Sequence, residues 1–236
     1  MVTPARLPLI IKFLDREYFR LRWAPRYPPT EELIFTILSQ NTTDINAGRA
    51  LESLRKKYPD WEKVSRAREA SIAAAIRSGG LADTKARYIK TVLAGILARQ
   101  GDLTLDFLKN MENREAIEYL TGYPGVGVKT ASCVLMFALG RPVMPVDTHV
   151  FRLGKRLDFL PEDATRESAH VILNAIVPQD DKYAFHINLV LHGRKVCKAG
   201  RPLCDECVIE PFCPSAIVEL RRTGAEGAGP VRFRFN

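Results

Sequence analysis

Lys129 is the residue whose type and position most directly suggest chemistry. The glycine- and proline-rich segment 122–127 breaks the chain between two segments with helical periodicity, 112–120 and 131–139. Lys129 then falls in the first turn of the second helix, where the positive end of the helix dipole disfavours an ammonium group. A neutral, nucleophilic amine is easier to reach there. On this segment alone, Lys129 could act as a nucleophile or simply contact phosphate.

The turn before Lys129 has the composition of an anion site. Glycine lets the backbone adopt positive φ and approach a ligand closely, so we expect the amides of Gly125, Gly127 and Val128 to converge at the helix start. Converging backbone amides bind phosphate. The segment therefore predicts a helix-hairpin-helix that contacts a phosphate group.

A single carboxylate follows a stiff linker downstream. Two prolines and a glycine precede Asp147, and a helix is predicted over 148–157. Asp147 is expected to cap that helix. A carboxylate fixed at this point could also act on a neighbouring amine or cation, and the two roles are compatible.

Four cysteines are confined to 17 residues near the end of the chain. Cys197, Cys204, Cys207 and Cys213 leave gaps of six, two and five residues, which indicates a shared metal centre. Structural zinc sites usually present two close cysteine pairs, whereas an iron–sulfur cluster is wider and tolerates unequal gaps. We therefore favour an iron–sulfur cluster, with a disulfide as the other reading. Cys133, alone in an apolar helix, is interpreted as an ordinary buried thiol.

Basic side chains lie on the same cysteine-rich loop. Lys198 and Arg201 stand between the first two cysteines, and Arg194 and Lys195 come just before. Such a cluster is typical of a loop that contacts phosphate, although a solvated charged loop has the same composition.

Helices are the elements expected to position these residues. Apolar residues recur at three and four positions rather than at two, so the fold is predicted to be all-α. Thr30 is expected to cap a helix over 31–40, and Asp44 the helix that follows. Further helices are predicted over 7–19, 71–77, 166–176 and 182–191, with a long one ending at Gly101.

Composition sets the frame. The chain has 236 residues, enough for one large or two modest domains, with a net charge of +8 and a pI near 9.4. That excess suits a polyanionic partner. With no apolar run long enough to span a membrane and no secretory signal, we expect an intracellular protein in which disulfides do not persist.

Three motifs together resemble one family. The segment 123–131, the Val-Asp-Thr-His segment 146–149 and the six-two-five cysteine loop resemble the helix-hairpin-helix DNA glycosylases, specifically the endonuclease III branch. The resemblance covers about 31–214. It implies two α-helical domains flanking a DNA-binding cleft.

The resemblance also implies domain boundaries. A six-helix barrel would occupy 31–141, with the helix-hairpin-helix at about 112–139. An iron–sulfur domain holding a [4Fe–4S] cluster would combine 1–30 with 142–214. The stretch 215–236 lies outside the resemblance, and we interpret it as a flexible basic tail.

By position, Lys129 is similar to the family's nucleophilic lysine and Asp147 to its catalytic aspartate. The implied activity is a bifunctional DNA glycosylase/AP lyase, acting on damaged, oxidised pyrimidines in double-stranded DNA. The damaged base is flipped out of the duplex, and attack by the amine at the sugar C1′ gives a Schiff base that β-elimination resolves. We expect a monomer, located in the cytoplasm or nucleoid if prokaryotic.

The remaining DNA contacts are also inferred from the resemblance. Leu81 resembles the leucine that the family wedges into the duplex, with a core residue at a helix start as the other reading. Where the family usually has a gap-filling glutamine, this chain has Asn41, and Gln40 stands one position earlier. One residue turns a helical side chain by about 100°, so Gln40 need not substitute for it. The expected DNA-contacting residues are Gly125, Gly127, Val128, Leu81, Gln40, Asn41, Lys198 and Arg201.

Two other functions are compatible with parts of the pattern. A monofunctional mismatch glycosylase would share the fold, but such relatives lack a lysine at the position of Lys129. A damage-binding iron–sulfur protein without catalysis would not need both Lys129 and Asp147. The departure at Gln40 and Asn41 keeps this second alternative open.

Overall fold

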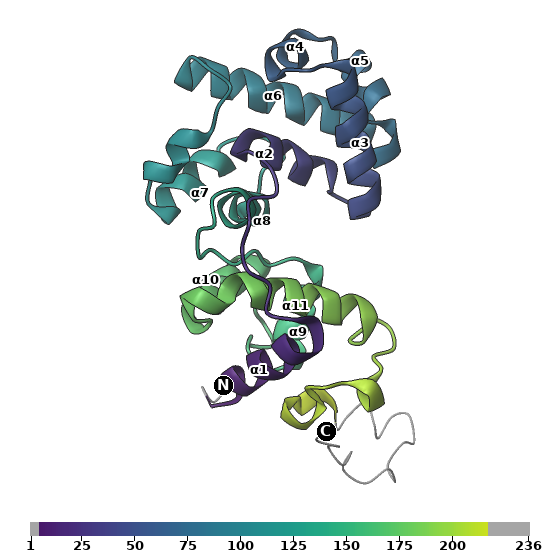
Figure 1. Cartoon of the computed structure of the whole chain (residues 1–236), viewed down its shortest axis with the longest axis vertical. Coiled ribbons are helices and arrows are strands. Elements are labelled where there is room, and N and C mark those ends of the chain that lie inside the picture. Colours follow the sequence, from purple (N-terminus) through teal and green to yellow (C-terminus); the bar gives the residue numbers. More distant parts are fainter. Residues whose placement is uncertain (1–4, 217–236) are drawn as a thin grey trace. The chain divides into compact units, whose positions relative to one another are not determined.

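The computed structural model describes residues 5–216, and every regular element in that range is a helix. The all-α prediction is therefore confirmed (Figure 1). The α-helices are α1 (Arg6–Tyr18), α2 (Pro29–Leu38), α3 (Asp44–Lys57), α4 (Trp61–Arg66), α5 (Glu69–Ala75), α6 (Ala82–Gln100), α7 (Asn113–Thr121), α8 (Val128–Cys133), α9 (Thr148–Arg156), α10 (Arg166–Ile176) and α11 (Lys182–Lys195).

The chain divides into two compact units. The central unit is Trp23–Pro145, and the terminal unit combines the described residues up to Arg22 with those from Val146 onward. The predicted barrel boundaries, 31 and 141, lie inside the central unit. Its first residues pack within that unit, because Trp23 lies against Gly140 and the guanidinium of Arg26 stacks on Phe137 at 4.7 Å. The predicted tail lies almost wholly outside the described residues.

The core of the central unit is built around α2. The predicted apolar positions of α2 are all fully buried, and neighbouring positions are buried as well, because α2 packs against α3, α6 and α8 (Figure 1). The long helix α6 contributes Ile89, Val92, Leu93 and Ile96 to the same cluster. This core holds the segments that follow α2 and precede α6 in fixed positions.

Two helix starts differ from the prediction. Thr30 lies inside α2, which is capped by Pro28 and begins at Pro29, and the Thr30 hydroxyl donates to the carbonyl of Leu103 at 2.9 Å. The reason is that proline suits the first helical position, since its fixed φ and missing N–H cost nothing there. Asp44 is likewise the first residue of α3, and Thr43 is the cap.

The second helix of the hairpin is longer than predicted. It begins at Val128 rather than at residue 131, and a π-helical turn, η3 (Val134–Ala138), continues it directly. Lys129 consequently lies one residue into α8. Its predicted place in the first helical turn is confirmed.

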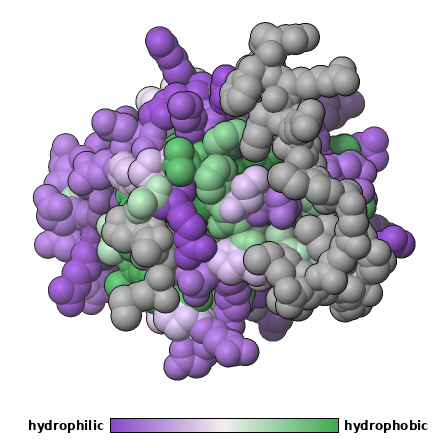
Figure 2. Space-filling model, turned by 90° about the horizontal axis from the view of Figure 1, so that it is seen from below, coloured by the Kyte–Doolittle hydropathy of each residue, from purple (hydrophilic) through white to green (hydrophobic). Residues whose placement is uncertain are grey.

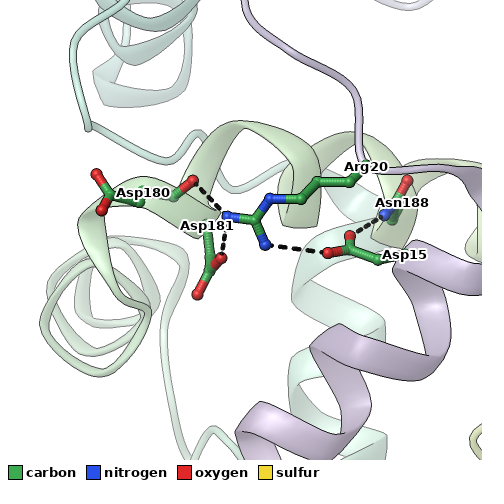
Figure 3. A network of polar contacts seen from close by, with 5 residues as sticks. All are labelled: Asp15, Arg20, Asp180, Asp181 and Asn188. Atoms are coloured by element: carbon green, nitrogen blue, oxygen red, sulfur yellow. Dashed lines mark hydrogen bonds and ion pairs between the residues drawn. The ribbon is translucent and has the colours of Figure 1, made fainter.

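In the terminal unit, α1 packs against α11. A network of polar contacts joins the end of α1 to the start of α11 (Figure 3). Arg20 contacts the carboxylates of Asp15 at 3.2 Å and Asp181 at 2.7 Å, and it donates to the carbonyl of Asp180. The amide of Asn188 donates to Asp15 at 2.9 Å. These contacts fasten the N-terminal segment to the helix that leads into the cysteine loop.

One face of the molecule is largely polar where the structure describes it. Figure 2 shows a face on which hydrophilic side chains surround a smaller hydrophobic area. Within the described residues, no helix has the length and apolar character needed to cross a membrane.

Candidate active site and cysteine pocket

The hairpin between α7 and α8 depends on one glycine. Gly125 has φ of +79°, and a Cβ at this position would lie 2.4 Å from the Cδ2 atom of Tyr88. Both the conformation and the space therefore require glycine. Gly127 is the exposed N-cap of α8 and has no side chain that could cover the helix start. These features match the predicted phosphate-binding turn, whose contacts with DNA stay a prediction.

Lys129 is half-buried beside two other ionisable groups of the central unit. Its ammonium is hydrogen-bonded to the thiol of Cys133, one turn later in the helix. Burial raises the pKa of Cys133, and the charge and hydrogen bond of Lys129 oppose that rise. Cys133 was interpreted as an ordinary buried thiol; it is fully buried but contacts the candidate nucleophile.

The second neighbour of Lys129 is a buried carboxylate that the sequence analysis did not single out. Glu32 has no exposed surface, and Arg26 holds it through two contacts, one of them 3.0 Å from Nε to Oε2. Burial raises the pKa of the Glu32 carboxyl, while Arg26, Thr36 and Lys129 act in the opposite direction. Glu32 looks in sequence like an ordinary acid in the first turn of a helix, so no signal marked it.

Asp147 is the N-cap of α9, as predicted. Its Oδ1 accepts a hydrogen bond from the backbone amide of Val150 at 2.8 Å, and its side chain is half-buried. The second carboxylate oxygen is not used by this cap. Lys129 belongs to the central unit and Asp147 to the terminal unit.

Leu81 and Asn41 share an unusual conformation. Leu81 precedes α6 with φ of +49° and is 57% exposed, so it is not a core residue. Asn41 is exposed and has φ of +53°. Gln40, by contrast, donates its side-chain amide to the carbonyl of Gly125 at 2.9 Å. Gln40 is therefore bound to the hairpin, whereas Asn41 is exposed on this loop.

The four cysteines of the terminal unit all line one pocket. Among the described residues, no three His, Cys, Asp or Glu side chains converge closely enough to hold a single metal ion. A zinc ion would need its sulfur ligands about 2.3 Å away, all around one point. A multi-iron cluster accepts thiolates spread around a wider space, so the pocket fits the cluster better than the ion. Lys198 and Arg201 are exposed on the loop.

Hydrogen-bonding groups lie against two of these sulfurs. Arg156 Nη1 donates to Cys197 Sγ at 3.1 Å, and His192 Nε2 lies 3.3 Å from Cys207 Sγ. The other ring nitrogen of His192 shares a hydrogen bond with the hydroxyl of Tyr18 at 3.0 Å. A donor placed like the Arg156 guanidinium stabilises a metal-bound thiolate.

Burial raises the pKa of two thiols in the pocket, Cys207 and Cys213. Burial, and to a smaller extent the three other cysteines, raise the pKa of Cys207 to about 12. Burial also lowers the pKa of His192 to about 4, so its imidazole is neutral at pH 7. Loading the pocket with metal would therefore release protons from the cysteines.

Comparison with known proteins identifies relatives. Residues 34–179 match the HhH-GPD superfamily of base excision DNA repair proteins. A protein of Arabidopsis thaliana, provisionally named a DNA glycosylase, is 42% identical over 179 residues; the match covers 76% of this chain and 59% of that protein. Endonuclease III of Sulfolobus acidocaldarius is 34% identical over 183 residues, covering 77% of this chain and 79% of its own.

A solved structure shows the same fold. A trapped covalent intermediate of endonuclease III with DNA superposes with a TM-score of 0.79 at 28% identity. The match covers 94% of this chain and 100% of that chain.

Proposed function

Because the chain belongs to the HhH-GPD superfamily and is an endonuclease III-like DNA glycosylase of base excision repair, we propose that it is a bifunctional enzyme. It removes damaged, oxidised pyrimidines from double-stranded DNA and then cleaves the strand at the resulting abasic site. The position of Lys129 in the first turn of α8, directly after the glycine hairpin, is the observation that carries this proposal.

The chemistry follows from a lysine at that position. The Lys129 amine forms a bond to the sugar C1′ while the bond from C1′ to the base breaks and its electron pair leaves with the base. The sugar ring opens to give a Schiff base, which makes the neighbouring C–H bond acidic. Loss of that proton expels the 3′ phosphate by β-elimination, and hydrolysis of the Schiff base restores the amine.

Asp147 supplies the carboxylate for this reaction. Its Oδ1 is occupied by the Val150 amide. We assign the other oxygen to stabilising positive charge as it develops on the sugar and to accepting a proton during the reaction. The solved endonuclease III structure was trapped as a covalent complex with DNA, which supports a covalent route in this chain as well.

DNA binding is common to the endonuclease III structures that this chain resembles. For this chain we assign the contacts to the hairpin amides, Leu81, Asn41, Lys198 and Arg201. The protein would act as a monomer inside the cell, in the cytoplasm or nucleoid if its source is prokaryotic. Affinity should fall steeply with salt, because neutralising phosphates releases counterions.

The cysteine pocket is assigned to a [4Fe–4S] cluster ligated by Cys197, Cys204, Cys207 and Cys213. When bound, the cluster would crosslink the loop that presents Lys198 and Arg201. The purified protein should contain about four iron atoms and matching acid-labile sulfide per chain. A colourless preparation containing one zinc per chain would overturn the assignment.

Borohydride trapping tests the bifunctional activity. Protein mixed with an abasic-site duplex should form a covalent adduct that Lys129→Ala abolishes. The Lys198→Ala variant is the matched control: it removes a phosphate contact and should weaken binding, but at saturating DNA the adduct should form normally. An undiminished adduct in Lys129→Ala would place the nucleophile elsewhere.

A panel of lesion duplexes defines the substrate. Duplexes with thymine glycol, 5,6-dihydrouracil or an abasic site should be scored separately for base loss and for strand cleavage. Base loss without an adduct would identify a monofunctional glycosylase. Binding without either product would identify a damage-binding protein, the alternative raised by the departure at Gln40 and Asn41.

A further inference from the structure

Lys85 is a buried lysine with an unusual pair of partners. Its side chain is 1% exposed, and Nζ donates to the carbonyl of Leu38 and to the carbonyl of Gly79, each at 2.7 Å. Lysine is almost never fully buried unless its charge is compensated. Here the compensation comes from backbone carbonyls at the ends of two helical segments, where helix dipoles are negative.

The two carbonyls belong to the segments that present Asn41 and Leu81. Leu38 is the last residue of α2, three positions before Asn41. Gly79 is the last residue of the 3₁₀ turn η1 (Arg77–Gly79), two positions before Leu81. The backbone amide of Lys85 also donates to the Leu81 carbonyl at 3.0 Å. One residue therefore fixes both loops at their bases.

Both loops contain a strained residue. Among the described residues, four that are not glycine have positive φ, and Asn41 and Leu81 are two of them. This conformation is unfavourable for leucine, and asparagine adopts it more readily, so at Leu81 above all it persists only where the surroundings enforce it. Both side chains are exposed, so their own packing does not enforce it. The anchored loop bases do.

We propose that Lys85 is a positioning residue for base extrusion: its single buried ammonium fixes Asn41 and Leu81 relative to each other, so that both side chains enter the duplex together at the damaged nucleotide. Gln40 adds the third connection, from the Asn41 loop to the carbonyl of Gly125 in the hairpin. The inference rests on the proposed function, because it takes Asn41 and Leu81 as DNA contacts.

The test compares Lys85→Met with Lys182→Met. Methionine has nearly the length of lysine but no donor, so it releases both carbonyls. Lys182, at the start of α11, is 7% exposed and lies in the terminal unit, so its substitution controls for the loss of a buried lysine. Single-turnover excision is measured on a thymine glycol duplex at saturating protein, below the melting temperature of every variant. Borohydride trapping on an abasic duplex and the fluorescence of 2-aminopurine opposite the lesion are measured in parallel.

Lys85→Met should slow excision by on the order of 10- to 100-fold, the effect of a misplacement near 1 Å. The 2-aminopurine signal of extrusion should fall in parallel, while trapping changes less than about 3-fold because an abasic site has no base to displace. Lys182→Met should leave the ratio of excision to trapping at its wild-type value. A wild-type ratio and signal in Lys85→Met would reduce Lys85 to a structural role and overturn the inference.

Two further outcomes are decisive. If Lys85→Met does not fold, Lys85→Arg replaces it, because arginine keeps the charge but changes the donor geometry. A lowered ratio of excision to trapping in that variant supports the inference, and an unchanged ratio overturns it. Wild-type protein that traps no abasic DNA would instead refute the proposed function, which separates the two failures.

Discussion

Asp147 combines a structural role with a proposed chemical one, and a substitution can separate them. Asparagine and aspartate are comparably good N-caps, since either side-chain oxygen can accept the amide hydrogen bond. Asp147→Asn should keep the 2.8 Å contact to Val150 and leave α9 intact. It removes only the negative charge, which the chemistry requires.

The expected magnitudes are far apart. Losing a charge at a helix start costs roughly 0.3–1 kcal/mol of stability, whereas Asp147→Ala also loses the cap and should cost about 1 kcal/mol or more. Removing a general acid or base slows a reaction by about 10²- to 10⁴-fold, equivalent to roughly 3–5 kcal/mol of barrier. Asp147→Asn should therefore fold and bind DNA but excise bases about a hundredfold more slowly or worse.

The assay needs a cap of the same kind elsewhere. Asp60 caps α4 in the same way, accepting from the amide of Lys63 at 2.7 Å. Asp60→Asn and Asp147→Asn should shift the melting temperature similarly, and only the latter should slow single-turnover excision. Affinity for a duplex with an uncleavable abasic analogue should remain near wild type in both.

Two results would refute this reasoning. Excision by Asp147→Asn within a few-fold of wild type would leave Asp147 as a helix cap alone. If Asp147→Asn is instead destabilised as much as Asp147→Ala, the charge rather than the hydrogen bond holds the start of α9.

Three other perturbations test the geometry. Gly125→Ala should lower the free energy of unfolding by about 2–5 kcal/mol in denaturant titrations, because a left-handed alanine must also displace the Tyr88 ring. Gly127→Ala is the control and should change stability little, because a Cβ at Gly127 meets nothing within 4 Å; equal effects would contradict the account of the hairpin. Tyr18→Phe should lower the free energy of unfolding by about 1 kcal/mol through the lost hydrogen bond to His192, and it should speed the loss of iron to a chelator. An unchanged rate of iron loss would show that this contact does not support the cysteine site. Burial raises the pKa of Glu32 above 4.5, so just above that pH the folded state binds more protons than the unfolded state and the free energy of unfolding falls as pH rises. Glu32→Gln should flatten this dependence of unfolding free energy on pH, and an unaltered dependence in the variant would show that other groups cause it.

Most helices could be predicted because their apolar periodicity reflects burial directly. The prediction over 166–176 coincides with α10, and Leu33, Ile34, Ile37 and Leu38 are all in the core. Helix starts were less predictable, because Thr30 and Asp44 are good caps by type, while the neighbouring Pro28 and Thr43 have the backbone conformation that a cap requires. Residue type alone does not determine that conformation.

The candidate site was predictable where a motif is local. Lys129 and Asp147 each stand at a helix start that the nearby glycines and prolines indicate, and both positions agree with the structure. The neighbours of Lys129 were not predictable. Glu32 comes close to it only because α2 packs against α8, and no pattern within either helix indicates that contact.

Lys85 shows why such contacts escape a sequence reading. A lysine in an otherwise amphipathic helix is expected to point to solvent. It is buried here because α2 and η1 end close together in the core. The carbonyls of their last residues, Leu38 and Gly79, are 41 positions apart in sequence, and both accept hydrogen bonds from Lys85. Its partners are backbone atoms, which carry no residue identity, so nothing in the sequence marks them. The positions of Asn41 and Leu81 therefore follow from the packing of α2, η1 and α6. Substitutions in that packing should slow base excision although the substituted residues do not contact DNA.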